Sequence, residues 1–272
     1  MATGQIRLTD MQKTALSTLY GKAMDAGTPD PILGDTLAER AVRELDFDFA
    51  TLKVPPGAQV SLPVRAKHLD GWTREFVTAS PDCVVLHLGA GLDTRVYRVD
   101  PPTATRWYDV DLPELISLRE RLYPARPGYT MIDTSVTDPA WLDRVAADLP
   151  VLVVAEGLVM HVPTPEVAAL FGRITERFPR GDLVFDVYSA LTATVISWGS
   201  RLGGTPVHLH AGLPRTLATS VPALRLADSV PYLTLPDLVS RLSRGVVSTA
   251  YFRAVRAGFQ RNSMLHLRYR FG

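Results

Sequence analysis

Short apolar runs alternate with amphipathic segments from Cys83 onward, and this alternation restricts the fold of the chain more than any other feature. The runs have the length of buried strands, and three of the segments between them have a helical pattern with proline in the first turn. Asp138 and Thr164 are placed as N-caps of the last two helices. Strands that alternate with helices form right-handed βαβ units, so the sequence predicts an α/β fold with a mostly parallel sheet. The expected strands are Val84–Leu88, residues 106–110, residues 129–132, Val151–Ala155 and residues 183–188, and the expected helices are Pro113–Leu122, residues 139–149 and residues 165–178.

The residues before this region are expected to be helical. Thr9 and Gln12 have the spacing of a capping box, and apolar residues then recur every four positions. A second helix is expected over residues 37–45, and Ser61, with proline two residues later, opens a third. These helices make residues 1–80 a helical cap.

The residues after the alternating region are less regular. Residues 189–222 are rich in Gly, Pro, Thr and His, which predicts an irregular or helical insertion that acts as a lid. A sixth strand is expected over residues 223–230. Met264–Phe271 alternates apolar and polar residues, as a half-buried antiparallel strand near a sheet edge does. We therefore expect a single domain over residues 1–272, composed of the cap, a core at residues 83–188, the insertion, and the last strands within residues 223–272.

The composition excludes several classes of protein. The 29 Lys+Arg and 28 Asp+Glu residues give a net charge of +1, which argues against binding to nucleic acid. No apolar run reaches the roughly 18 residues of a membrane span, and residues 1–10 lack the pattern of a signal peptide, so no membrane partner is expected. Cys83 is the only cysteine, which excludes a cysteine-rich zinc site, and no metal is expected. We expect a cytoplasmic protein; the sequence leaves the oligomeric state open.

A glycine-rich turn after the first expected strand is the strongest local signal. It reads Leu88-Gly-Ala-Gly-Leu-Asp93, and its glycines allow a sharp turn and a close approach of a ligand to the backbone. The next strand ends in Asp109-Val-Asp111. Asp111 lies 20 residues after Gly91, at a strand end where a carboxylate accepts hydrogen bonds from ribose hydroxyls. Asp109 is the competing acid.

This pairing of turn and acid fits an adenosine-containing ligand, which is either NAD or S-adenosylmethionine. The third glycine of a dinucleotide-binding fingerprint would fall at Thr94, so that fingerprint is incomplete. A methyl donor has no pyrophosphate and does not need that glycine. A strand-to-helix turn without any ligand is the structural alternative.

A carboxylate follows the fourth expected strand directly, at Glu156. Burial of a carboxylate costs free energy unless a partner meets it. At the carboxyl end of this strand Glu156 would lie beside the topological switch point, where open α/β sheets bind ligands. It is placed to hold the ammonium group of a bound amino-acid moiety or a nearby arginine, and an ordinary capping or ion-pairing role is the alternative.

The chain resembles the leucine carboxyl methyltransferase family, and in particular its bacterial branch of polyketide-type O-methyltransferases. The matching segments are residues 84–98 (VVLHLGAGLDTRVYR), 107–119 (WYDVDLPELISLR) and 151–163 (VLVVAEGLVMHVP). Residues 64–77 resemble the Arg-containing helix of the family, and residues 14–38 resemble its N-terminal helical cap. The similarity runs from about Thr14 to Tyr188 in the expected order.

The resemblance implies a Rossmann-like sheet of seven strands, mostly parallel with the last strand antiparallel, together with an N-terminal helical cap and an insertion before the last strands. It also implies an S-adenosylmethionine-dependent O-methyltransferase, with S-adenosylhomocysteine as product. The acceptor would be a carboxylate or a phenolic hydroxyl of a small natural product or peptide in secondary metabolism.

The resemblance further assigns roles to individual residues. Residues 89–91 would line the methionine part of the cofactor, and Asp111 would bind the ribose hydroxyls. Arg65, joined by Lys22, would pair with the cofactor carboxylate, and Glu156 would lie near the amino-acid end. The full set of cofactor-binding residues expected from the family is Lys22, Arg65, Leu88, Gly89, Ala90, Gly91, Asp111, Leu112, Ser135, Val136, Glu156 and Gly157.

Two positions depart from the family pattern. Ser135-Val136 stands where the family has Asp-Leu, which removes a carboxylate contact to the adenine amino group. His161 stands where the family usually has tyrosine. A carboxylate acceptor, with a pKa of roughly 4, needs no base, whereas a phenol, with a pKa of about 10, would benefit from His161 as a catalytic base. The residues expected to contact the acceptor are His161, Tyr20, Tyr188 and Trp198.

Two other functions fit part of the sequence. The first is an NAD(P)-dependent oxidoreductase on a related sheet, against which stand the missing third glycine and the absence of an evident Tyr-x-x-x-Lys pair. The second is a non-catalytic relative that keeps the cofactor site. His87, in the middle of a strand, and His68, on a helix with Trp72, are expected to be packing residues.

Overall fold

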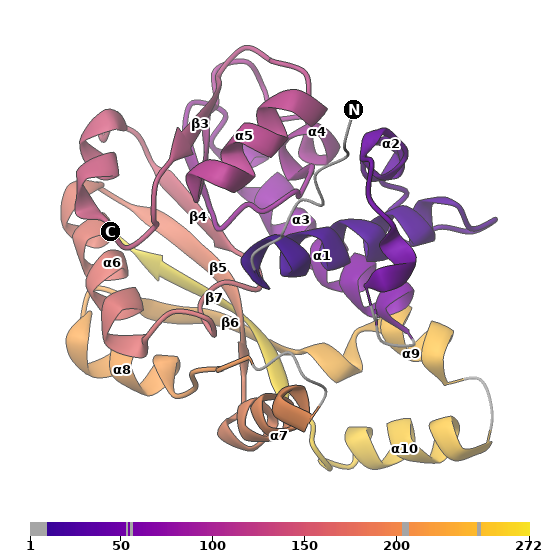
Figure 1. Ribbon diagram of the computed structural model, residues 1–272. Coiled ribbons are helices and arrows are strands. Elements are labelled where there is room, and N and C mark those ends of the chain that lie inside the picture. Colours follow the sequence, from indigo (N-terminus) through magenta and orange to yellow (C-terminus); the bar gives the residue numbers. More distant parts are fainter. Residues whose placement is uncertain (1–9, 53, 55–56, 203–206, 244–245) are drawn as a thin grey trace.

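Seven strands form one sheet with the order β3-β2-β1-β4-β5-β7-β6, and helices cover both of its faces (Figure 1). This computed structural model describes residues 10–52, 54, 57–202, 207–243 and 246–272. β7 is antiparallel to β5 and β6, and the other neighbouring strands are parallel. The predicted sheet is therefore confirmed. The strands are β1 (Val84–Leu88), β2 (Arg106–Asp111), β3 (Tyr129–Asp133), β4 (Val151–Ala155), β5 (Gly181–Tyr188), β6 (Arg225–Pro231) and β7 (Met264–Phe271).

Helices precede the sheet as a cap, connect its strands and fill the insertion. The α-helices of the described residues are α1 (Asp10–Ala26), α2 (Thr36–Glu44), α3 (Ala58–Ala79), α4 (Arg95–Val99), α5 (Pro113–Leu122), α6 (Thr164–Arg177), α7 (Ala190–Leu202), α8 (Leu213–Ser220), α9 (Pro236–Leu242) and α10 (Val246–Arg256). The 3₁₀ helices are η1 (Phe49–Thr51), η2 (Pro139–Arg144) and η3 (Tyr232–Thr234). The helical cap over α1 to α3 agrees with the prediction. That the whole chain forms a single domain stays a prediction.

The two central strands, β1 and β4, determine where the crevice of the fold lies. β1 and β4 are neighbours in parallel register, with Val84 opposite Val151, and every residue of both strands is buried. One face of the sheet packs on η2, α6 and α8, and the other packs on α3 and α4. The chain leaves β1 toward β2 and leaves β4 toward β5, on opposite sides. The carboxyl ends of β1 and β4 therefore form the topological switch point, where α/β sheets bind ligands.

Three local predictions are wrong. Residues 139–149 do not form one helix: η2 ends at Arg144, and Val145 is extended because the chain must return to the amino end of β4. α3 begins at Ala58, one turn before Ser61, after a glycine in a left-handed conformation. Thr164 is the first residue of α6 and not its N-cap.

Other local predictions hold within the described residues. The Asp138 carboxylate accepts a hydrogen bond from the Ala140 N–H at 3.0 Å, which confirms it as an N-cap. The insertion contains α7 and α8, as a helical insertion requires. The predicted capping box cannot be placed, because Thr9 lies outside the described residues. In the described part of the chain, every helix is too short or too polar to cross a membrane.

One fully buried carboxylate, Asp109 on β2, joins four elements beneath the crevice. It accepts hydrogen bonds from the Trp107 indole at 2.8 Å, the Tyr129 hydroxyl at 2.5 Å and the Arg119 guanidinium of α5. Nδ1 of His87, on β1, lies 3.0 Å from Asp109 Oδ1, the oxygen that also accepts from the Trp107 indole. Burial would raise the pKa of Asp109, but Arg119 and His87 hold the pKa at about 2.

Substitution of Asp109 by asparagine should remove a pH-dependent part of the stability. The folded pKa of about 2 lies below the ordinary value of 3.8, so the stabilisation is complete above pH 4 and is lost as the pH falls through 2. We expect this loss to reach about 1 kcal/mol at pH 3 and about 2 kcal/mol at pH 2. Urea unfolding at several pH values gives the free energy of unfolding of the wild type and of Asp109→Asn. The difference between the two should become smaller as the pH falls.

Asp133→Asn is the matched control, because Asp133 ends the neighbouring strand β3 and its side chain is exposed. It should change stability little at any pH. A difference between wild type and Asp109→Asn that stays constant from neutral pH to pH 3 would contradict the role given to Asp109.

Candidate active site

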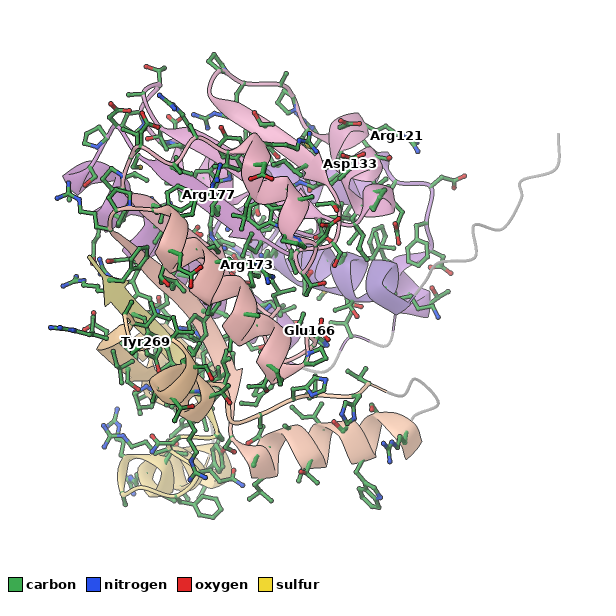
Figure 2. All side chains as sticks on the ribbon, turned by 90° about the vertical axis from the view of Figure 1, so that its left-hand side faces the viewer. Arg121, Asp133, Glu166, Arg173, Arg177 and Tyr269 are labelled. Atoms are coloured by element: carbon green, nitrogen blue, oxygen red, sulfur yellow. The ribbon has the colours of Figure 1, made fainter. Side chains whose placement is uncertain are left out.

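A cavity of about 460 Å³ lies at the carboxyl ends of β1, β2 and β4. The loops after these strands form one side of it, and α1 and α3 of the cap form the other, through Lys22 and Arg65 among others. Glu166, at the N-terminal end of α6 in Figure 2, is exposed and also lines the cavity. The volume is in the range of small-molecule sites, and the position is the switch point of the sheet.

The glycine-rich turn brings backbone to the cavity surface. Gly89 and Gly91 both have positive φ angles, of 61° and 52°, which favour glycine. A Cβ atom on Gly89 would also lie only 2.7 Å from Leu158. Arg119 donates to the carbonyl oxygens of Gly91 and Asp93 at 2.9 and 2.8 Å. Because Arg119 also binds Asp109, the buried carboxylate below the turn helps to hold its shape.

Asp111 ends β2 and reaches the cavity, whereas Asp109 does not. Its Oδ2 accepts a hydrogen bond from the Gly91 N–H at 2.6 Å, and its Oδ1 accepts one from the Leu112 N–H at 2.7 Å. Burial raises the pKa of Asp111 despite these two bonds. Each carboxylate oxygen has a further lone pair, so the group is able to accept two more hydrogen bonds from a ligand diol.

Glu156 lies among three cations at the carboxyl end of β4. Arg95 of α4 donates to its Oε2, Arg65 Nε lies 3.1 Å from its Oε1, and Lys22 Nζ lies 3.6 Å from the same oxygen. Burial would raise the pKa of Glu156, but these cations hold it well below its ordinary range. The ion-pairing alternative stated for Glu156 is thus present in the structure, and a contact to a ligand ammonium stays a prediction.

Asp93 extends the same charge network toward the cap. It accepts from Arg98 at 2.6 Å and lies 3.1 Å from Lys22. Arg95 and Arg98 both bind Asp70 of α3, at 2.6 and 2.8 Å. These contacts join α1 and α3 of the cap to α4 directly beside the turn.

Arg65 keeps donors that face the cavity. Its Nε binds Glu156, and its Nη1 lies 3.5 Å from Asp186 Oδ2, but neither Nη atom makes a hydrogen bond with another described residue. Asp186 is fully buried, and its Oδ1 accepts from the Gly157 N–H at 2.6 Å. These Nη donors, which make no hydrogen bond within the described residues, suit a ligand carboxylate.

His161 and Tyr188 supply polar groups to the wall near Arg65. Burial, followed by the charges of Arg65 and His210, lowers the pKa of His161, so its imidazole is neutral at pH 7. Burial raises the pKa of Tyr188, which is therefore a neutral phenol. Most other residues on this wall, such as Leu158 and Met160, are apolar.

Comparison with known proteins identifies the family. Residues 15–175 match the leucine carboxyl methyltransferase family. The chain is also 39% identical over 235 residues to the tetracenomycin polyketide synthesis O-methyltransferase TcmP of Streptomyces glaucescens, across 86% of this chain and 87% of that protein. The chain belongs to the leucine carboxyl methyltransferase family. A further relative, the S-adenosyl-L-methionine-dependent methyltransferase dpfgK of Gibberella zeae, is 31% identical over 82% of each protein.

Solved structures share the fold at low sequence identity. A DUF574-family protein of Streptomyces avermitilis has a TM-score of 0.60 at 16% identity, over 95% of this chain and 97% of that one. Magnesium protoporphyrin IX methyltransferase of Synechocystis, with bound S-adenosylhomocysteine, has a TM-score of 0.51 at 12% identity, over 96% and 100%. Together with the relatives, this confirms the prediction of an S-adenosylmethionine-dependent O-methyltransferase and gives no support to an oxidoreductase.

The cavity of this methyltransferase fits its cofactor at both ends. Asp111 offers free lone pairs for a ribose diol, and the Nη donors of Arg65 suit the cofactor carboxylate. All but one of the predicted cofactor-binding residues line the cavity; the exception, Leu88, is fully buried in β1 beneath the turn. The individual roles of these residues stay predictions.

The predicted acceptor residues divide into two groups. His161 and Tyr188 line the cavity. Tyr20 does not: it faces the other side of α1 and stacks on Phe49 at 5.1 Å between ring centroids. Trp198 does not either, since it is 64% exposed on α7. Aromatic type alone was the basis for both predictions, and it does not specify a direction.

Several groups around the site carry no local signal in the sequence that places them there. Asp93, Thr18 and Leu62 line the cavity and were not predicted to do so. His87 is expected to be a packing residue, and it is buried with partners for both ring nitrogens: Arg95 donates to its Nε2 at 3.2 Å, and its Nδ1 lies 3.0 Å from Asp109 Oδ1. It nevertheless reaches the cavity. The one acid and two arginines in the LDTRVYR run (residues 92–98) are the available signal for this network.

Asp111→Ala should weaken the binding of S-adenosylhomocysteine by about 10- to 100-fold, because two ribose hydrogen bonds to a carboxylate are lost. Isothermal calorimetry measures this change. The variant also loses the hydrogen bond from the Gly91 N–H to Asp111, so the melting temperature should fall, but only modestly. Asp133→Ala, at the paired position of β3, is the control. Equal affinities of wild type and Asp111→Ala would refute the assignment.

Proposed function

We propose that this methyltransferase esterifies a carboxylate of a small, largely apolar molecule of polyketide type. The observation that carries the proposal is the character of the wall near Arg65, where apolar side chains surround two neutral polar groups, His161 and Tyr188. The relative TcmP, named for tetracenomycin polyketide synthesis, supports this class of acceptor.

The chemistry of the transfer favours apolar walls. The cofactor supplies a methyl group on a cationic sulfur, and a carboxylate acceptor is an anion at pH 7 with a pKa of roughly 4. Opposite charges disappear in this reaction, so a site that excludes water favours the transition state over the separated ions. Among the described lining residues, the lysine and arginine side chains are Lys22 and Arg65, and both pair with Glu156.

The contribution of the chain is chiefly orientation. Alignment of two bound reactants is able to supply up to about 7–11 kcal/mol of the barrier in favourable cases. Asp111 and Arg65 would hold the two ends of the cofactor, while Tyr188 and His161 would direct the acceptor oxygen by hydrogen bonds. A carboxylate needs no proton transfer in this step.

A phenolic hydroxyl is the second candidate acceptor, and one observation favours it. The lowered pKa of His161 leaves an imidazole that is able to accept a proton at pH 7. If the acceptor is a phenol, His161 is a catalytic residue that removes the hydroxyl proton during transfer.

Two further expectations come from the sequence. One is that the protein lies in the cytoplasm, and the other is that a peptide is an alternative to a small-molecule acceptor.

A matched pair of acceptors separates the two candidates. Polycyclic aromatic carboxylic acids and the phenols with the same ring systems are incubated with isotopically labelled S-adenosylmethionine, and labelled product is counted. We expect the acids to be methylated, with kcat/KM nearly constant from about pH 6 to 9 because the carboxylate is ionised throughout. His161→Ala should retain activity on the acid within about tenfold.

Methylation of the phenols alone would contradict the carboxylate proposal. In that case kcat/KM should rise with pH through the pKa of His161, and His161→Ala should lose about 10²- to 10⁴-fold. Binding of S-adenosylhomocysteine without methylation of any acceptor in the panel would favour the non-catalytic alternative.

A further inference from the structure

The net charge of +1 conceals a strong separation of charge along the chain. Residues 1–186 contain 19 Lys+Arg and 26 Asp+Glu, a net charge of −7. Residues 187–272 contain ten arginines, no lysine and two aspartates, a net charge of +8. Two long stretches, residues 187–227 and 238–272, have no acidic residue at all. Charge asymmetry of this size indicates an anionic partner for the basic part.

The basic part also exposes large apolar side chains on α7. Leu191, Val195 and Trp198 recur at helical spacing on one face and are 66%, 58% and 64% exposed. Residues 190–200 contain no charged residue. The opposite face of α7 packs through Ala193 on Met160, so the exposed face is not needed for the fold. Soluble monomers rarely leave such a continuous apolar face uncovered.

α10 and the turn after it add aromatic and basic groups. Tyr251 and Phe259 are 37% and 57% exposed, and their ring centroids lie 6.5 Å apart. Four exposed arginines accompany these apolar groups, and none of them has an ion pair with another described residue. They are Arg201, Arg253, Arg256 and Arg261.

α7 and α10 lie at the same end of the molecule. They occupy the lower edge in Figure 1, and both remain there after the 90° rotation to Figure 2. Both helices therefore contribute to that end of the molecule. We call the exposed apolar residues and arginines of α7, α10 and the turn after α10 the basic apolar end.

We propose that the basic apolar end docks onto a lipid bilayer that contains anionic phospholipids. Helices that lie in a membrane interface combine apolar and aromatic side chains, which enter the acyl boundary, with arginines that meet the lipid phosphates. Nucleic acid would satisfy the arginines but offers little for Leu191 and Val195. This docking is peripheral, and it replaces the expectation from overall composition that no membrane takes part.

Docking would place the reaction close to the bilayer. Met160 lines the cavity and packs against Ala193 on the inner face of α7, so the cavity wall lies against the helix whose outer face belongs to the basic apolar end. An apolar acceptor that partitions into lipid would then be concentrated near the site. The docking itself does not depend on the proposed carboxylate acceptor.

Vesicle co-sedimentation tests the docking directly. The full chain is mixed with vesicles of phosphatidylcholine and with vesicles in which about a third of the lipid is phosphatidylglycerol. We expect binding to the anionic vesicles, little binding to the neutral ones, and release at about 0.5 M salt, where charges are screened. Arg253→Glu with Arg256→Glu should weaken binding at least about tenfold, and Trp198→Ser should also weaken it.

Arg121→Glu with Arg144→Glu reverses the same number of exposed charges away from this end and should leave vesicle binding unchanged; Arg121 is labelled far from α7 in Figure 2. Calorimetry with S-adenosylhomocysteine shows that each variant is folded, and it separates a failure of docking from a failure of the proposed function. Equal binding of all variants, or no binding to anionic vesicles, would overturn the proposal. A dimer seen by light scattering that Trp198→Ser abolishes, without vesicle binding, would assign this end to a second copy instead.

Discussion

Two buried carboxylates, Asp109 and Glu156, determine how the elements around the crevice are arranged. Asp109 lies near the carboxyl end of β2 and Glu156 directly after β4, where an unpaired buried charge would cost several kcal/mol. Arg119 meets the first and Arg95 meets the second. Because these arginines come from α5 and α4, the ion pairs join the sheet to the helices that follow the glycine-rich turn. The cap is held by the same network through Asp70 and Lys22, which accounts for its fixed position over the cavity.

This arrangement divides structural work from ligand contacts. Both carboxylate oxygens of Asp109 accept hydrogen bonds from protein groups only. Asp111, two residues later, keeps lone pairs that are available to a ligand in the cavity. Arg65 likewise uses Nε for Glu156 and keeps its Nη donors. A site built in this way is ordered before the cofactor arrives, which reduces the entropy that binding must offset. Orientation of this kind is what a methyl transfer without acid–base chemistry requires.

The sheet and the turn were predictable because their signals are local. Val151–Ala155 is apolar throughout and Val84–Leu88 is apolar except for His87, and such short apolar runs suit buried strands. The choice of Asp111 over Asp109 rests on its place nearer the strand end; Asp111 lines the cavity and Asp109 does not, and the ribose contact of Asp111 stays a prediction. Tyr20 and Trp198 point away from the cavity because side-chain direction depends on how α1 and α7 pack, which sequence spacing does not encode. Residues 139–149 failed as a helix for a related reason: the return path to β4 overrode the helical pattern.

The central claim is that the cavity at the switch point holds S-adenosylmethionine between Asp111 and Arg65. A crystal structure of the protein with S-adenosylhomocysteine tests it most directly. The account predicts that the ribose hydroxyls lie within hydrogen-bond distance of the Asp111 carboxylate and that the ligand carboxylate meets the Nη atoms of Arg65. A ligand that binds elsewhere, or one that occupies the cavity with its ribose away from Asp111, would contradict the account.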